Sequence, residues 1–303
     1  MFVAECFPGT VSFNTGAPFQ PFSRNPQMRF SYNLKGLKFI ATAFSQRDFT
    51  SNGPDGTSSK YLRNARVPNI DFQIQFNPDS TEHVFGIGVD YKMNTPRLYS
   101  EITETAAVTT VDTLTWATKV TPAVTKKYAV NENIASLSAI AFAKLKFKPI
   151  TIKLEGVYAQ NAYDMSMIGG YAAMNFKDVA TGELNYTNIT TGSVWLDLTT
   201  NGKKIQVGLF AGYTKNLGSN DTIKTSKLAL YTRGANATAT TYIDNVYRVS
   251  PRIVFISGKL DIAFELEYTV ASYGDIKTNT KLEVTNGKPV SNIRGLLAFT
   301  YKF

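Results

Sequence analysis

The feature that most constrains this chain is a two-residue alternation of apolar and polar side chains, which recurs along its length. In the last segment one face carries Ile293, Leu297, Phe299, Tyr301 and Phe303, whereas the other carries Arg294, Ala298, Thr300 and Lys302. A period of two indicates a β-strand with one apolar face. The alternation marks about eleven segments of about 9–14 residues, which is long for soluble strands. No segment has a convincing helical stripe, so we predict an all-β, antiparallel chain.

The connections between these segments are short and long in turn. The short ones cover residues 35–36, 78–82, 148–149, 201–202 and 258–259. The long ones cover residues 47–66, 93–133, 163–185, 216–241 and 273–290, and they are rich in Thr, Ser, Asn and Gly. Short turns on one side and longer loops on the other are typical of transmembrane β-barrels. We expect the long connections to be solvated loops.

A barrel and a soluble sandwich differ in what the apolar face contacts. Aromatic residues lie at or near the strand ends on that face, namely Tyr32, Tyr91, Tyr158, Tyr213, Tyr268, Tyr301 and Phe303. Membrane barrels place aromatic rings at both interfaces with water, whereas a sandwich core gives no reason for such regular tyrosine ends. We therefore predict an antiparallel transmembrane β-barrel of the porin type, with a soluble sandwich as the alternative.

The composition excludes several other classes of protein. The 303 residues include 32 Lys and Arg against 23 Asp and Glu, a formal net charge of +9 that favours anionic partners. Because Cys6 and His83 are single, an internal disulfide, a thiolate zinc cluster and sites with several imidazoles are excluded, and we expect no metal and no cofactor. The cations are spread along the whole chain, which fits nucleic-acid binding poorly.

Barrel closure bears on where the sequence starts. The segment Met28 to Leu34 runs in the same direction as the last one, and a closed single-chain barrel normally has an even number of strands. An open sheet edge in lipid leaves unpaired amides at high cost. We therefore expect residues 1–303 to form a single barrel domain that is incomplete at its amino end, with further strands and a signal peptide upstream. Met1 is then an internal methionine or a boundary.

Two stretches near the amino end resemble a known family of outer-membrane porins. Residues 1–10 (MFVAECFPGT) and 22–30 (FSRNPQMRF) resemble a strand end and a return segment of the DcaP-like family, and residues 52–56 and 61–65 resemble the loop that follows. The carboxyl-terminal Phe299, Tyr301 and Phe303 are similar to the terminal signature that the barrel-assembly machinery reads.

The resemblance implies a specific organisation of the chain. Residues 1–27 correspond to a loop that folds inward and narrows the pore, and residues 28–303 to strands and loops, with Met28 opening the sixth strand. Five preceding strands and about eleven visible ones give about sixteen, a size at which barrels leave an aqueous lumen. The family also implies homotrimers.

If the apolar face meets lipid, the opposite face lines water and its charges select solutes. Candidate pore-lining residues for anion selectivity are Arg24, Arg29, Lys38, Arg248, Arg252 and Arg294. Rings of Arg or Lys in a pore favour anions, and Arg24 with Arg29 is the best candidate for the constriction. The alternative is that these arginines pair with acids such as Asp71, Glu265 or Glu267 and brace the wall.

Two isolated residues invite catalytic interpretations. His83 could serve a membrane hydrolase together with a Ser or Asp, but it lies beside a short turn, away from the long loops. Cys6 could be a reactive thiol, but a lone cysteine without a neighbouring base is more often inert. We therefore expect no enzymatic activity.

These patterns predict a porin in the outer membrane of a Gram-negative type of cell envelope. Its expected function is passive diffusion of small hydrophilic solutes, with a preference for anions. The alternative is a plugged structural or adhesive barrel that binds a partner through its long loops. An outer-membrane enzyme is a third possibility if His83 lies with a Ser or Asp in an open cleft.

Overall fold

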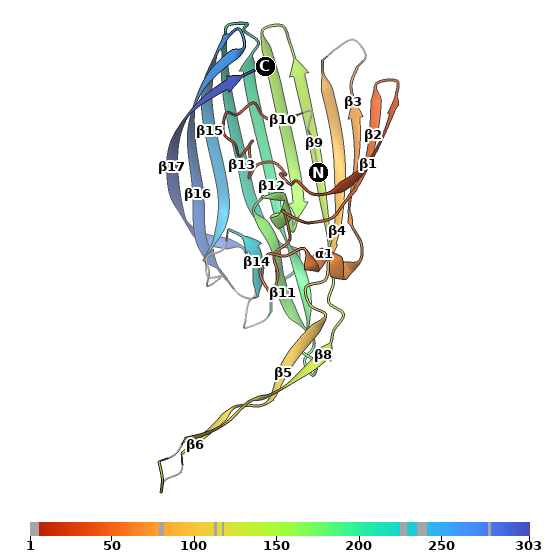
Figure 1. Cartoon of the computed structure of the whole chain (residues 1–303), viewed down its shortest axis with the longest axis vertical. Coiled ribbons are helices and arrows are strands. Elements are labelled where there is room, and N and C mark those ends of the chain that lie inside the picture. The colour runs from red at the N-terminus through yellow and green to blue at the C-terminus, as the bar shows by residue number, and fades with distance from the viewer. Residues whose placement is uncertain are drawn as a thin grey trace.

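The computed structural model describes residues 6–78, 82–111, 114–116, 118–224, 229–234, 241–277 and 280–303. These residues form one large antiparallel sheet whose main path has eleven strands, each paired with the next along the path. The sheet is strongly curved, with the short turns at one end and the long connections at the other (Figure 1). The prediction of an all-β antiparallel fold with about eleven strands is confirmed.

The strands of the main path follow chain order across the sheet. They are β1 (Gln27–Leu34), β2 (Leu37–Phe44), β3 (Asn69–Phe76), β4 (Val84–Asn94), β9 (Ile134–Lys146), β10 (Ile150–Gln160), β12 (Glu183–Thr200), β13 (Ile205–Ser219), β15 (Thr241–Ser257), β16 (Leu260–Ile276) and β17 (Val284–Tyr301). Beside this path, β11 (Gly169–Asp178) pairs with β12, and β14 (Leu230–Arg233) pairs with β11.

The sheet is apolar on its convex side and mostly polar on its concave side, apart from an apolar cluster on β9, β10, β12 and β13. In β3, for example, the polar residues Asn69, Asp71, Gln73 and Gln75 are buried, whereas Ile70, Phe72 and Phe76 are more than 40% exposed. A soluble sandwich buries its apolar faces against each other, so that alternative is wrong. Because contiguous apolar surface of this extent is costly in water, the convex face is the lipid-facing surface of a transmembrane β-barrel.

Aromatic side chains border this apolar surface near both ends of the strands. Toward the long connections, Tyr213 is the register partner of Tyr247, whose ring lies 6.4 Å from that of Tyr268. Toward the short turns, Phe255 and Tyr301 are exposed on the same surface. Phe255 follows Tyr247 by eight positions on the same strand, or about 27 Å, which after tilting fits the apolar band of about 25 Å in membrane barrels.

The sheet has two edges in the described part of the chain, β1 and β17. Both faces of β1 are exposed along its whole length, and most of β17 is exposed as well. The described strands therefore form an arc rather than a closed ring, and the closed barrel of about sixteen strands stays a prediction.

The long connections contain more regular structure than the sequence indicated. The 93–133 connection forms a protruding arm of two ribbons, made by β5 (Tyr99–Thr105) with β8 (Val124–Ala129) and by β6 (Val108–Val111) with β7 (Thr118–Thr121) (Figure 1). Its Thr and Val residues are β-branched and favour extended backbone. The 47–66 connection carries α1 (Lys60–Ala65), and the 163–185 connection carries the whole of β11. These segments are therefore not loops, although the ribbons of the arm are exposed, as expected for a solvated connection.

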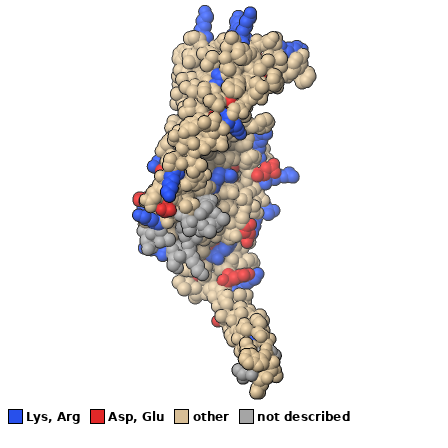
Figure 2. All heavy atoms as spheres, turned by 90° about the vertical axis from the view of Figure 1, so that its left-hand side faces the viewer, with Lys and Arg blue, Asp and Glu red and all other residues tan. Residues whose placement is uncertain are grey.

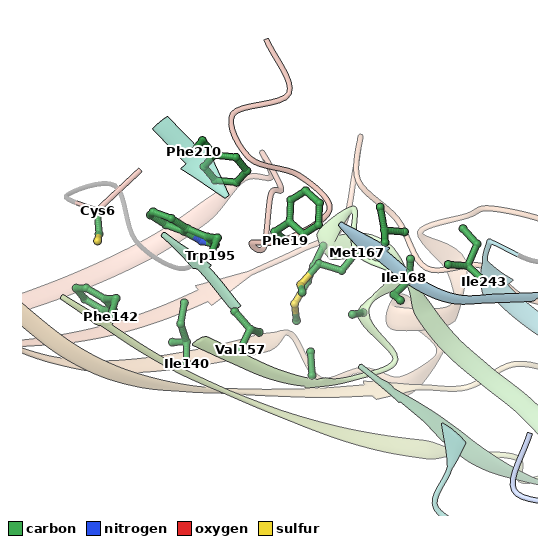
Figure 3. Packing of buried hydrophobic residues seen from close by; sticks show 14 of the residues in the cluster. Cys6, Phe19, Ile140, Phe142, Val157, Met167, Ile168, Trp195, Phe210 and Ile243 are labelled. Carbon is green, nitrogen blue, oxygen red and sulfur yellow. The ribbon is translucent and has the colours of Figure 1, made fainter. Parts of the chain in front are cut away.

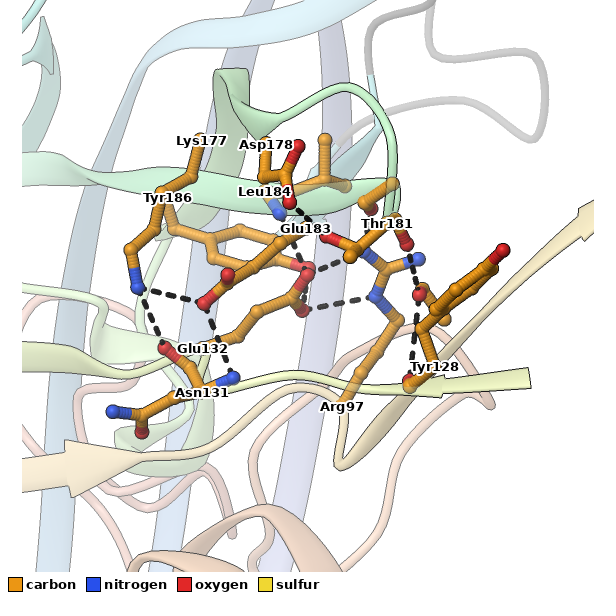
Figure 4. A network of polar contacts seen from close by, with 12 residues as sticks. Arg97, Tyr128, Asn131, Glu132, Lys177, Asp178, Thr181, Glu183, Leu184 and Tyr186 are labelled. Atoms are coloured by element: carbon orange, nitrogen blue, oxygen red, sulfur yellow. Dashed lines mark hydrogen bonds and ion pairs between the residues drawn. The ribbon is translucent and has the colours of Figure 1, made fainter.

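A polar network holds the base of the arm against the turn between β11 and β12 (Figure 4). Arg97 forms an ion pair with Glu132 and donates a hydrogen bond to the Gly182 carbonyl at 2.9 Å. The Glu132 carboxylate also accepts a hydrogen bond from the Tyr186 hydroxyl at 2.7 Å, and its contact with the guanidinium raises the pKa of Arg97. Ser100 donates to the Thr181 carbonyl. The start of the arm is therefore fixed to the barrel.

The turns at the short-turn end of the barrel are rich in lysine. Lys and Arg side chains project from the short-turn end at the top of Figure 2, where the turns contain the exposed residues Lys35, Lys148, Lys203, Lys204 and Lys259.

Among the described residues, no helix has the length and hydropathy needed to span a bilayer.

A charge placed on the convex face tests its contact with hydrocarbon. Leu209 on β13 lies on that face, and its register partner Pro251 is midway between Tyr247 and Phe255 on β15, so Leu209 is at the middle of the apolar band. We expect Leu209→Lys to destabilise the protein folded in lipid vesicles by about 2–4 kcal/mol, because a cation at the bilayer midplane is poorly solvated. Leu209→Phe is the matched control and should cost little. Urea titration of the folded fraction measures both, and equal stability of the two variants would contradict a lipid-facing Leu209.

Candidate channel lumen

The concave face of the sheet is covered in part by the chain segment before β1. Residues 6–26, here called the N-terminal segment, cross this face without joining the sheet (Figure 1). Residues 1–5, which begin the predicted constriction loop, lie outside the described residues. The arrangement places irregular backbone inside the barrel, where polar wall residues can pair with it.

Acidic side chains of the wall hold the N-terminal segment through its backbone amides. The Gly9 amide donates to the Asp197 carboxylate on β12. The amides of Val11 and Ser12 donate to Glu265 on β16, at 2.7 and 3.4 Å. These charge-assisted bonds are stronger than neutral ones, so they fix the path of the segment.

Basic side chains of the wall hold the same segment through its oxygen atoms. Lys153 on β10 donates to the Phe7 carbonyl at 2.6 Å. Arg248 on β15 donates to the Asn14 side chain at 2.7 Å, and Arg294 on β17 donates to Ser12 Oγ at 2.6 Å. Donors on three strands thus complement the acidic acceptors.

An apolar cluster anchors the middle of the segment (Figure 3). The ring of Phe19 packs 5.9 Å from that of Phe210, which lies 6.0 Å from Trp195. Gly212 makes room for this contact, because a Cβ at that position would lie 2.5 Å from the Phe19 ring. The Phe19 carbonyl accepts a hydrogen bond from Ser193 at 2.6 Å. Part of the barrel interior is therefore filled and dry.

The predicted constriction residues Arg24, near the end of this segment, and Arg29, on β1, lie together. Both line a cavity of about 730 Å³, to which Arg47 and Asp48 also contribute. Arg24 is exposed and lies over the Phe22 ring at 5.4 Å from its centre. The cavity wall therefore contains three guanidinium groups and one carboxylate.

Three other predicted pore residues are in ion pairs with wall acids. Arg252 contacts both oxygens of Asp197 at 2.7 and 3.1 Å. Arg248 and Arg294 approach the Glu267 carboxylate at 3.3 and 2.9 Å. The Glu267 contacts brace the neighbouring strands β15, β16 and β17, as the alternative interpretation anticipated, whereas the Arg252–Asp197 contact reaches from β15 across β13 to β12. All three reduce the positive charge that these arginines present to a solute.

The remaining predicted site residues lie at the short-turn end or on the outer surface. Lys38 is half-buried on β2, with Asn33 and Gln75 as its register partners. Phe299 and Tyr301 are exposed on the convex face of β17, and Phe303 is fully exposed just beyond it. The structure therefore separates the terminal aromatic residues from the lumen.

Sequence reasoning missed two acids that organise the lumen. Asp197 lies in a segment with large apolar residues on both faces, which hid its inward orientation, and it contacts both Gly9 and Arg252. Asp164 belongs to the one-turn helix η1 (Ala162–Met165) inside a predicted loop, where it forms a buried ion pair with Lys92. Only long-range packing reveals either partner.

The two residues considered for catalysis have structural contacts. His83 Nδ1 accepts a hydrogen bond from the Lys146 amide at 3.1 Å, and its ring packs against Phe147 near the short turns. Cys6 is fully buried, with its thiol directed at the Ala143 carbonyl at 3.4 Å. Among the described residues, no cluster of three or more His, Cys, Asp or Glu side chains is placed to hold a metal ion.

An outward apolar face, an inward polar face and an inner segment together define a transmembrane β-barrel of the porin type. No protein-family model and no curated protein matches the sequence. Among solved structures, the outer membrane channel DcaP of Acinetobacter baumannii matches with a TM-score of 0.66 and 12% identity, over 100% of this chain and 69% of that chain. OmpT (in-vitro folded), an outer membrane protein of Vibrio cholerae, matches with a TM-score of 0.50 and 8% identity, over 100% and 74%. These likenesses show the outer-membrane barrel fold.

Release of the N-terminal segment can be followed with the native cysteine. Glu265→Ala removes the acceptor for two backbone amides, each charge-assisted bond being worth about 1.5–3 kcal/mol. We expect Cys6 to react with a water-soluble maleimide at least about tenfold faster in this variant, because the segment detaches more often. Glu104→Ala, on the arm, is the control and should leave the labelling rate unchanged. Equal rates in both variants would show that Glu265 does not hold the segment.

Proposed function

We propose that the protein is an outer-membrane porin through which small hydrophilic solutes diffuse passively, with a preference for anions. The observation that carries this proposal is the polar concave face behind an apolar convex face. Such a wall separates a wet interior from lipid and needs no catalytic residue or cofactor. The likeness to an outer membrane channel supports a channel in general.

The proposal includes closure of the arc into a ring. The edges β1 and β17 present backbone groups that need partners in lipid. We infer that about five further strands pair with these edges and give about sixteen in all, with residues 1–27 as the inward constriction loop.

The preference for anions rests on the cavity beside the N-terminal segment. Arg24, Arg29 and Arg47 face one acid, Asp48, around this cavity. An excess of guanidinium groups in a narrow passage raises the local concentration of anions and offsets part of their dehydration cost. The paired Arg248, Arg252 and Arg294 contribute less to selectivity and more to the wall.

Assembly into homotrimers of the DcaP-like type belongs to the same proposal. Exposed Phe299, Tyr301 and Phe303 at the end of the chain are suited to recognition by the barrel-assembly machinery before insertion. The convex face then meets outer-membrane lipid or a neighbouring subunit.

A structural or adhesive barrel is the second candidate, favoured by the filled part of the lumen and by the protruding arm. Planar-bilayer recordings separate the two functions. Stable conductance steps with an anion-biased reversal potential support the porin, whereas a folded protein that never conducts supports the adhesive barrel.

Neutralising the constriction arginines tests the anion preference. In Arg24→Ala/Arg29→Ala we expect the reversal potential in a salt gradient to shift toward zero, because two of three guanidinium groups leave the cavity. The chloride-to-potassium permeability ratio should fall several-fold. Arg63→Ala, which removes an exposed cation of α1, should leave the ratio unchanged. An unchanged ratio in the double variant would remove these residues from the constriction.

Changing the last residue tests the terminal signature. Phe303→Ser should reduce the amount of heat-resistant trimer in outer-membrane fractions several-fold, because the assembly machinery loses an aromatic contact. Phe13→Ser changes an equally exposed phenylalanine of the N-terminal segment and should have little effect. Normal trimer yield from the Phe303 variant would contradict a role in assembly.

A further inference from the structure

A second basic cavity lies at the short-turn end of the lumen. It has a volume of about 330 Å³ and lies between β9, β10, β12, β13 and β15. Its lining is Gly9, Lys144, Lys146, Thr151, Lys153, Thr199, Asn201, Gln206, Gly208, Arg252 and Val254. The lining contains four cationic side chains and no acid, although Asp197 contacts Arg252 from the side. We call it the lysine cavity.

Two of the four cations are placed against each other without a compensating carboxylate. Lys144 on β9 and Lys153 on β10 are direct register partners on the concave face. Like charges opposite each other destabilise an antiparallel pair. Within the described residues, no carboxylate lies in ion-pair contact with either ammonium group, whereas Lys146 pairs with Glu82. A bound anion between the two lysines would relieve this repulsion.

The third group that points to a ligand is Arg252. This residue is only 4% exposed, and its Nη2 is engaged by Asp197 and Thr199. Its Nη1 is buried and has no hydrogen-bond partner in the described structure. A buried donor without an acceptor is costly, and here it belongs to a side chain that lines the lysine cavity.

We propose that the lysine cavity is a second anion site of the channel, and that it binds tetrahedral oxyanions such as inorganic phosphate or a phosphate monoester. The Lys144 and Lys153 ammonium groups come from neighbouring strands, while the Arg252 guanidinium lies on β15. A phosphate has enough oxygens to meet donors on several sides, whereas a monocarboxylate presents two in one plane. The Asp197 carboxylate, which pairs with Arg252, repels a phosphate and so limits how closely the phosphate can approach that side of the cavity.

The N-terminal segment separates this site from the cavity lined by Arg24, Arg29 and Arg47, here called the arginine cavity. Phe7 lines the arginine cavity and Gly9 lines the lysine cavity. Lys153 donates to the Phe7 carbonyl, so it is linked to the boundary between them. The inference rests on the proposed channel function and adds a binding site that an anion entering from the short-turn end meets first. Several binding sites of moderate strength along a pore favour conduction.

The test compares Lys144→Gln/Lys153→Gln with Lys35→Gln/Lys203→Gln, which removes two exposed lysines from the same end outside the cavity. Inorganic phosphate is titrated into each chamber in turn while chloride current is recorded across phosphatidylcholine bilayers. We expect phosphate to reduce the current of the unmodified protein more strongly from one chamber. In the cavity variant the half-blocking concentration should rise at least about tenfold, and in the control variant it should not change.

A binding measurement separates this inference from the channel proposal. Phosphate is titrated calorimetrically into the detergent-solubilised protein, whose unchanged heat-modifiable mobility shows that each variant is folded. Cavity-dependent binding without conductance would overturn the porin function and keep the site. Conductance with identical phosphate block in all three proteins would overturn the site and keep the porin. Tight binding of phosphatidylglycerol micelles that depends on both lysines, without binding of free phosphate, would assign the lysines to lipid headgroups and also overturn the site.

Discussion

The structure depends on one constraint, namely that every backbone polar group at membrane depth must find its partner within the protein. The antiparallel main path meets it by pairing each strand with the next, from β1 to β17. Because the backbone groups are hydrogen-bonded within the sheet, the side chains are free to sort by environment. Ile, Leu, Val and aromatic residues face outward to lipid, and amide or charged residues face inward. The same constraint makes the two exposed edges significant, because they are where this pairing stops.

The polar interior is organised around the N-terminal segment rather than left open. Asp197 and Glu265 accept its amides, while Lys153, Arg248 and Arg294 bind its oxygen atoms. The segment therefore satisfies wall charges that would otherwise face one another, and it divides the lumen into two basic cavities. Under the proposed function, selectivity and stability are coupled in this arrangement, since the residues that brace the wall also set the shape of the passage.

The fold could be predicted because its signal is local: a two-residue period over about ten residues identifies a strand and its two faces without knowledge of its neighbours. Arg24 and Arg29 could be placed near one another because they are close in sequence. Asp197 and the Lys144–Lys153 pair could not be interpreted, because their significance depends on cross-strand register and on the path of a distant segment. The arm was missed for another reason. Its Thr-rich ribbons lack an apolar face, so their alternation carries little hydrophobic contrast.

The N-terminal segment has a mechanical consequence as well. It continues directly into β1 and is hydrogen-bonded to Glu265 on β16 and Arg294 on β17. It therefore connects the two edges of the described sheet across the lumen. In the closed ring proposed above, strand number and tilt set the circumference. The segment adds a connection across the lumen from β1 to β16 and β17, so shortening or lengthening it would change the ellipticity of the passage without altering any strand.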